Sequence, residues 1–179
     1  MSNECQFIFF TYICRTEKLI LMIMDMNRVF MQRAIDLAKE SISSGGGPFG
    51  AVIVRNGEII AESSNSVTRD NDPTAHAEIN AIRVACKKLN TFILEGCEIF
   101  TSCEPCPMCL GAIYWSHISR IYYAATRADA ANGGFDDDFI YREINISPNI
   151  RSVPAFSLMP EEGAQVFNIW LNKEDRTDY

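Results

Sequence analysis

Pro73-Thr74-Ala75-His76-Ala77-Glu78 and Pro105-Cys106-Pro107-Met108-Cys109 are the two stretches that decide the fold of this chain. Each of them predicts the start of a helix. Asp72 is a favourable N-cap, Pro73 suits the first helical position, and Pro105 suits that position in the second stretch. We therefore expect one helix from about residue 72 to residue 89 and another that begins at Pro105.

The side chains at these two helix starts are typical of a catalytic zinc site. Cys106 and Cys109 are three positions apart, so they share one helix face near its positive end, where thiolates are favoured. With His76 they make three ligands of a tetrahedral zinc site, and the fourth position stays open for water. The carboxylate of Glu78, two residues from the histidine, can move protons to and from that water.

Two other kinds of zinc protein share parts of this pattern. A structural zinc site needs a fourth protein ligand, which His117 or Cys103 could supply. His117 follows the cysteine helix, however, and Cys103 precedes it in the approach loop, where we expect packing. A non-catalytic binding module or scaffold stabilised by zinc has no need of Glu78. The pattern therefore favours hydrolytic deamination of an amidine-like carbon in a heteroaromatic ring.

The rest of the chain predicts alternating helices and strands. Asn56-Gly57 between two apolar runs is a strong signal for a type I′ hairpin turn, because both turn residues need a positive φ. The expected elements are a helix over 27–43, hairpin strands over 51–54 and 59–61, strands near 98–101, 121–124 and 153–157, and helices over 136–144 and 161–172. This order implies an α/β fold with a mixed sheet covered by helices on both faces.

Composition limits the class of protein. A chain of 179 residues with 47% hydrophobic and 22% charged residues suits one soluble domain. A net charge of −7 gives no basic surface for phosphate backbones, so we expect no nucleic-acid partner. Seven cysteines, an odd number, fit a reducing cytoplasm better than a disulfide scaffold.

Residues 1–23 differ from the rest. Two apolar blocks, 7–14 and 19–24, flank Arg15-Thr16-Glu17-Lys18, and neither block is long enough to span a bilayer. Membrane tethering or targeting is the alternative to a poorly ordered extension. We expect the extension, with Met24 or Met26 beginning a functional domain over 24–179.

The motifs resemble those of the cytidine deaminase superfamily, and in particular the bacterial and plant type of guanine deaminase. The zinc motifs are shared with cytosine and tRNA adenosine deaminases, so they indicate the chemistry and not the substrate. The more selective stretches are Gly47-Pro48-Phe49-Gly50-Ala51, the Gly-Phe-Asp-Asp core within 131–141, and the tail that ends in Tyr179. The resemblance covers about residue 26 to the C-terminus and implies a three-layer α/β/α fold with a five-stranded mixed sheet.

The resemblance also implies roles for particular residues. The metal ligands are His76, Cys106 and Cys109, the catalytic residue is Glu78, and the substrate contacts are Phe49, Asn65, Ala77, Trp115, Asp137 and Tyr179. Phe49 and Trp115 would wall the base pocket, Asn65 would hydrogen-bond the ring, and Asp137 would accept from purine N–H groups. Which of Asp136, Asp137 and Asp138 faces the pocket stays open. Ordinary structural roles also stay open for these residues. Phe49 could pack in the core, Asn65 could form a turn, Asp137 could be a charge at a helix start, and Tyr179 could lie in a frayed terminus.

The expected reaction is conversion of guanine and water to xanthine and ammonia, with one zinc ion per subunit. A guanosine deaminase is the nearest alternative, and cytosine or tRNA adenosine deamination is further away. In this family the C-terminal segment, here 160–179, can be exchanged between subunits, so we expect a homodimer whose partner can complete the active site. We expect the protein to act in the cytoplasm without a membrane partner.

Overall fold

A computed structural model describes the backbone of residues 3–178 and the side chains of residues 23–178. The chain divides into two compact units, Met1–Thr126 and Arg127–Tyr179. All four strands of the described chain lie in the first unit. The zinc motifs lie there too, so the first unit positions the candidate site.

The four strands form one mixed sheet. They are β1 (Gly50–Arg55), β2 (Glu58–Ser64), β3 (Cys97–Cys103) and β4 (Arg120–Ala125), in the order β2-β1-β3-β4. β1 runs antiparallel to both of its neighbours, whereas β3 and β4 are parallel. The predicted mixed sheet is confirmed, and the strands predicted at 98–101 and 121–124 lie within β3 and β4.

The prediction of a fifth strand at 153–157 is wrong. These residues form no strand, and Val153 and Phe156 are exposed. The backbone N–H of Ala155 donates to the carbonyl oxygen of Pro148 at 2.9 Å, so a local turn takes a hydrogen bond that a sheet neighbour would otherwise make. The described part of the sheet therefore has four strands, because β-branched and aromatic residues favour a strand only where a neighbouring strand pairs with them.

The hairpin turn is confirmed. Asn56 and Gly57 have φ values of 53° and 79°, the positive angles that a type I′ turn requires at both positions. Arg55 pairs with Glu58 directly across the turn. The turn therefore sets the register that buries Ala51 and Ile53 on one face of β1 and Val52 and Val54 on the other.

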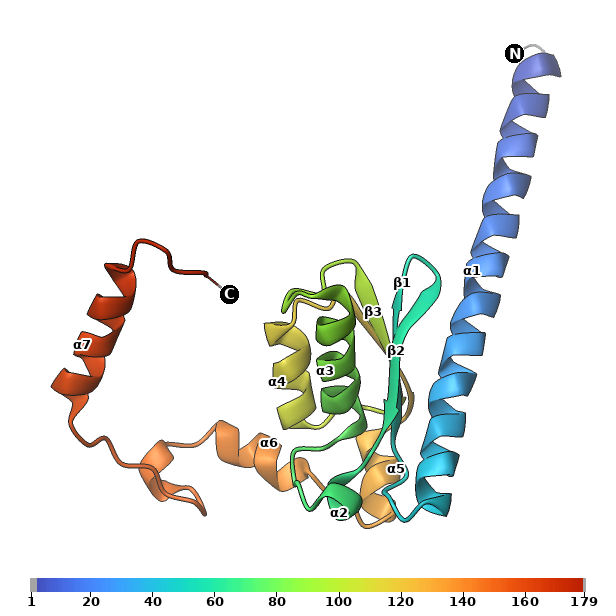
Figure 1. The fold of residues 1–179 in the computed structure, drawn as a ribbon. Coiled ribbons are helices and arrows are strands. Elements are labelled where there is room, and N and C mark those ends of the chain that lie inside the picture. Colours follow the sequence, from blue (N-terminus) through green and yellow to red (C-terminus); the bar gives the residue numbers. More distant parts are fainter. Residues whose placement is uncertain (1–2, 179) are drawn as a thin grey trace. The chain divides into compact units, whose positions relative to one another are not determined.

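Helices cover both faces of this sheet (Figure 1). On one face, α1 (Asn3–Ser43) packs Phe30 and Ala34 against Val52, Val54 and Phe100. On the other face, α3 (Ala77–Leu89) and α4 (Pro107–Trp115) join the core. Small side chains on α3 bring that helix close to the sheet: Ala77, Ala81 and Ala85, all fully buried. The three-layer α/β/α arrangement is thus confirmed for the first unit.

Three helix starts differ from the predictions. α1 begins at Asn3 instead of residue 27, because no glycine or proline interrupts the chain between Asn3 and Ser43. α3 begins at Ala77, not at residue 72, since the Asp72 carboxylate instead accepts hydrogen bonds from the backbone and the hydroxyl of Thr74. α4 begins at Pro107 instead of Pro105. The expectation that residues 1–23 are poorly ordered stays a prediction, and most of their side chains lie outside the described residues.

The second unit contains only helices among its described residues. They are α5 (Arg127–Asn132), α6 (Asp138–Ile144), the 3₁₀ turn η1 (Pro148–Ile150) and α7 (Pro160–Leu171). The first unit also contains a short helix, α2 (Val67–Asp70). The helices predicted at 136–144 and 161–172 match α6 and α7. Within residues 3–178, no helix is long and apolar enough to cross a membrane.

Candidate active site

The two zinc-motif helices present their first ligands from equivalent positions. His76 is the N-cap residue of α3 and Cys106 is the N-cap residue of α4, and both have extended backbone conformations. Pro107 follows Cys106 at the first helical position, where its missing N–H costs nothing. Cys109 lies one turn further along α4 and is fully buried. Both helices therefore direct their positive ends at the same point.

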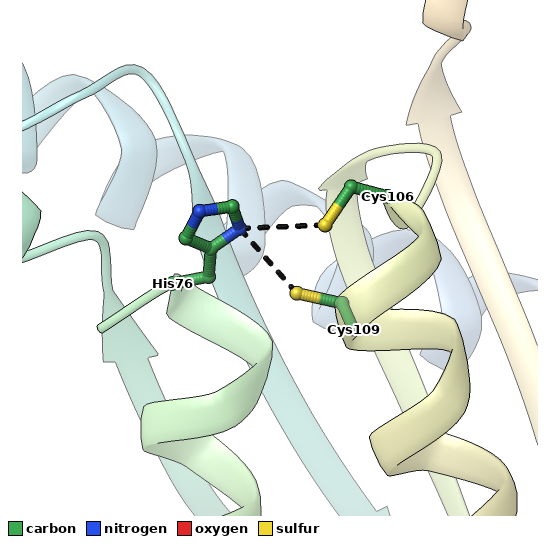
Figure 2. Close-up of side chains that lie close together, drawn as sticks. All are labelled: His76, Cys106 and Cys109. Carbon is green, nitrogen blue, oxygen red and sulfur yellow. Dashed lines mark hydrogen bonds between the residues drawn. The ribbon is translucent and has the colours of Figure 1, made fainter. Parts of the chain in front are cut away.

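The three ligand atoms lie together at this point (Figure 2). The Nδ1 atom of His76 is 3.5 Å from the sulfur of Cys106 and 3.5 Å from the sulfur of Cys109. All three atoms lie within 4.8 Å of one another. An ion with tetrahedral bonds of about 2.0 Å to nitrogen and about 2.3 Å to sulfur would separate those atoms by about 3.6 Å. The donor set and its spacing therefore fit zinc.

The electrostatics of the cysteine pair favour a thiolate. The hydrogen bond from Cys109 lowers the pKa of Cys106 to about 4, with burial opposing the shift. The same hydrogen bond, together with burial, raises the pKa of Cys109, and hydrogen bonding to Cys106 raises the pKa of His76. Cys106 is thus held in the form that binds metal, and Cys109 would lose its proton on coordination.

Glu78 is the buried carboxylate of the site. It lies in the first turn of α3 and is only 7% exposed. Burial raises its pKa, because a charged carboxylate loses hydration there. A carboxyl group with a raised pKa beside a metal site is suited to accept and return a proton near neutral pH.

The residues that could close a structural zinc site lie outside the group of possible ligands. Cys103, at the end of β3, donates its thiol to the carbonyl oxygen of Thr126 at 3.6 Å. His117 follows α4, beyond the end that carries the ligands, in a left-handed conformation with φ 57°. Within the described chain, the group of possible ligands contains only His76, Cys106 and Cys109. Three protein ligands leave one position of a tetrahedral site for water or substrate.

Asn65 is connected to the start of α3 through the residue that follows it. The residue that follows it, Ser66, accepts from the side chain of Asn80 and donates its backbone N–H to the carbonyl oxygen of Ala75, the neighbour of His76. Sequence reasoning missed this role of Asn80, because an asparagine on an amphipathic helix gives no distinguishing signal. The hydrogen bonds bring the end of β2 to the start of α3.

The orientation of the Asn65 amide follows from its partners. Its Oδ1 atom accepts from the backbone N–H groups of Gly47 at 3.3 Å and Val67 at 3.2 Å. These two donors identify the oxygen, so the amino group Nδ2 points the other way. Nδ2 makes no hydrogen bond to the described residues, and no fully buried side-chain nitrogen or oxygen among them lacks a partner, so Nδ2 keeps some access to solvent although Asn65 is only 5% exposed. An amide that is held by two backbone donors and keeps an accessible N–H donor is suited to bind a ligand acceptor.

The remaining predicted substrate residues have different placements. Phe49 packs against the core cluster that contains Ala77, the first residue of α3. Trp115 is the last residue of α4 and is 67% exposed. Asp137 is the N-cap residue of α6 in the second unit, and Tyr179 lies outside the described residues. The substrate roles of these residues stay predictions.

Comparisons with known proteins agree with this geometry. The family model of the cytidine and deoxycytidylate deaminase zinc-binding region matches residues 24–125. The chain is 51% identical over 154 residues to guanine deaminase from Bacillus subtilis, and this alignment covers 86% of the present chain and 99% of that protein. It is 46% identical over 105 residues to a tRNA-specific adenosine deaminase from Aquifex aeolicus, with 59% and 68% of the two chains covered.

Solved structures of guanine deaminase and of a purine-bound relative also match this chain. The crystal structure of guanine deaminase from Bacillus subtilis has a TM-score of 0.83 at 51% identity, covering 85% of this chain and 98% of that one. NE0047 in complex with 2,6-diaminopurine has a TM-score of 0.60 at 36% identity, covering 62% of each chain. The matched region contains all three ligands and Glu78. The chain therefore belongs to the cytidine and deoxycytidylate deaminase family, and it is an enzyme with a zinc site at the paired starts of α3 and α4.

Proposed function

We propose that this protein deaminates guanine hydrolytically, releasing xanthine and ammonia. The observation that carries the proposal is the extent of the match to guanine deaminase from Bacillus subtilis. That alignment spans 154 residues, so it must include at least 28 residues of the second unit, beyond Thr126. The family model ends at residue 125, and the match to the tRNA adenosine deaminase spans 105 residues. Because only the longer match must extend into the second unit, we attribute the choice of guanine to residues of that unit.

The first step of the reaction depends on Glu78. When bound, zinc lowers the pKa of a coordinated water to about 7 and so supplies the nucleophile. His76, Cys106 and Cys109 would hold the ion, and Glu78 would take up the proton that the water gives up. Its raised pKa suits it to pass that proton to a ring nitrogen and later to the departing ammonia. Burial of the carboxylate keeps the proton from being lost to solvent.

Recognition of the base rests on complementary hydrogen bonds. The Nδ2 group of Asn65 donates to a purine acceptor, and the carboxylate of Asp137 accepts from a purine N–H group. Adenine has no N1–H and would place a lone pair against that carboxylate, which is costly in a buried site.

The assembly is a homodimer in which the C-terminal segment of one subunit completes the site of the other. Apolar side chains of α7 are exposed in this chain, notably Val166, Phe167 and Ile169. An apolar helix face of this kind needs a covering surface.

The protein acts in the cytoplasm, where its cysteines would stay reduced. Among the described side chains, no cysteine forms a disulfide.

An ammonia-release assay tests the proposed function. Zinc-loaded protein is offered guanine, guanosine, adenine and cytosine separately, and xanthine formation from guanine is followed by chromatography. We expect turnover of guanine and little turnover of the other three. A preference for guanosine would move the assignment to a nucleoside deaminase with the same zinc chemistry. Turnover of none, with zinc bound, would contradict the proposed substrate class.

A further inference from the structure

A buried serine on α1 lies against the predicted base-binding residues. Ser41 is 1% exposed and lies two residues before the end of α1. Its hydroxyl donates to the backbone carbonyl oxygen of Asn65 at 3.0 Å, across 24 residues of sequence. A buried hydroxyl directed at one remote residue constrains that residue, because breaking the bond would leave a buried acceptor unsatisfied.

The same serine also holds the loop before β1. The backbone N–H of Gly46 donates to the carbonyl oxygen of Ser41 at 2.8 Å. The next residue, Gly47, donates to the Asn65 side chain, and the backbone N–H of Asn65 donates to the carbonyl oxygen of Phe49 at 3.0 Å. Ser41 thus fixes Asn65 directly through its backbone and indirectly through the loop that orients its amide.

Close packing leaves this arrangement little freedom. A Cβ atom on Gly46 would collide with the hydroxyl of Ser41 and would lie 2.6 Å from the carbonyl oxygen of Asn65. On Gly47 it would lie 3.3 Å from the carboxamide of Asn65. The loop is therefore pressed against both residues, and a shift of one of them moves the others.

We infer that Ser41 is a positioning residue for base recognition, which acts by holding the Asn65 amide in the orientation that leaves Nδ2 available to the purine. Ser41 itself touches no substrate. The inference rests on the proposed function for its kinetic readout alone, because the position of the amide can be observed without turnover.

The kinetic test compares two serines of the same helix. Ser41→Ala should raise KM for guanine about fivefold, as expected for the loss of roughly one hydrogen bond, with kcat and zinc content nearly unchanged. Ser43→Ala is the matched control, since the exposed Ser43 hydroxyl donates only to Lys39 within α1. An unchanged KM in Ser41→Ala would overturn the inference.

A double-mutant cycle separates positioning from general destabilisation. If Ser41 acts through Asn65, Ser41→Ala should add almost nothing to KM in an Asn65→Ala background. A full fivefold effect in that background would overturn the inference. If guanine is not turned over, the proposed function is wrong, but the inference about Ser41 can still be tested by nuclear magnetic resonance. The side-chain amide signal of Asn65 should shift in Ser41→Ala but not in Ser43→Ala, and a signal that stays in place would contradict it.

Discussion

His76 and Cys106 are both helix N-cap residues, and their ligand atoms lie 3.5 Å apart (Figure 2). Neither side chain caps its own helix, so both remain available to a metal. The unpaired N–H groups of two helix starts create a positive potential at the site. That potential favours the anionic sulfur ligands, and the sheet beneath both helices keeps the geometry rigid.

Glu78→Gln should abolish turnover without loss of the metal. The amide is nearly isosteric but cannot carry a proton between water and base, so we expect kcat to fall by about 10²–10⁴. Zinc content should stay at one ion per chain. The control is Glu95→Gln, the same chemical change at an exposed position. Turnover within threefold of the original enzyme would show that the carboxylate is not the proton carrier.

Cys109→Ser should remove the metal and the activity together. A serine hydroxyl is a poor zinc ligand, so bound zinc and turnover should both be nearly lost. Removal of zinc from the unmodified protein by a chelator should also lower the thermal midpoint, because binding stabilises the folded state. Cys86→Ser on α3 serves as the control and should retain zinc. Full zinc occupancy in Cys109→Ser would contradict the assigned ligand set.

Gly50→Ala should be strongly destabilising. A Cβ atom there would lie 2.7 Å from the Cβ of Leu37 and 2.8 Å from the backbone nitrogen of Ala38, where α1 crosses the start of β1. We expect a loss of about 3 kcal/mol in the free energy of unfolding, measured with denaturant. Gly111→Ala, with nothing within 4 Å of the new Cβ atom, should instead gain about 0.5–1 kcal/mol. Equal effects of the two changes would contradict this packing.

The ion pair between Arg33 and Glu62 should make a small contribution to stability that depends on pH. Arg33 donates two hydrogen bonds to the Glu62 carboxylate, which lowers the pKa of that group in the folded state. A lowered folded pKa stabilises the protein above the unfolded value of about 4.3, and the effect disappears as pH falls through the folded value.

Because both side chains are about one-third exposed, solvent screens the pair. Glu62→Gln should therefore cost only about 0.5 kcal/mol at pH 7 and nothing near pH 3. Denaturant unfolding at both values of pH measures the difference. A cost that is the same at pH 3 and pH 7 would rule out the ionic contribution.

Deletion of residues 1–23 should leave catalysis intact. The family model begins at residue 24, and the described ligands and Asn65 lie far along the chain from the deleted part. We expect kcat/KM for guanine within twofold of that of the full chain. A folded, zinc-containing truncation without activity would show that the extension has a direct role.

The sequence was sufficient where a residue's function is local. The hairpin turn at Asn56-Gly57 was predicted correctly, because these two residue types readily adopt the positive φ values that the turn requires. Cys106 and Cys109 were predicted to share one helix face because they are three positions apart, and their ligand atoms do lie together with that of His76. Helix starts were less predictable: Asp72 has the residue type of an N-cap, yet its carboxylate binds Thr74 instead.

Features that depend on remote partners could not be predicted. The run at 153–157 has the residues of a strand, but no neighbouring strand pairs with it in the described chain. Ser41 gives no signal in the sequence either, because its importance comes from a hydrogen bond to Asn65, 24 positions away. Pairing and burial of this kind are determined by the folded chain as a whole.

The stoichiometry of guanine breakdown by the zinc-loaded protein tests the proposed deamination most directly. Xanthine and ammonia are quantified as guanine is consumed, with His76→Ala as the metal-free control. We expect one xanthine and one ammonia for each guanine consumed, and no product from the control. Guanine that remains unchanged, while guanosine, adenine or cytosine releases ammonia under the same conditions, would contradict it.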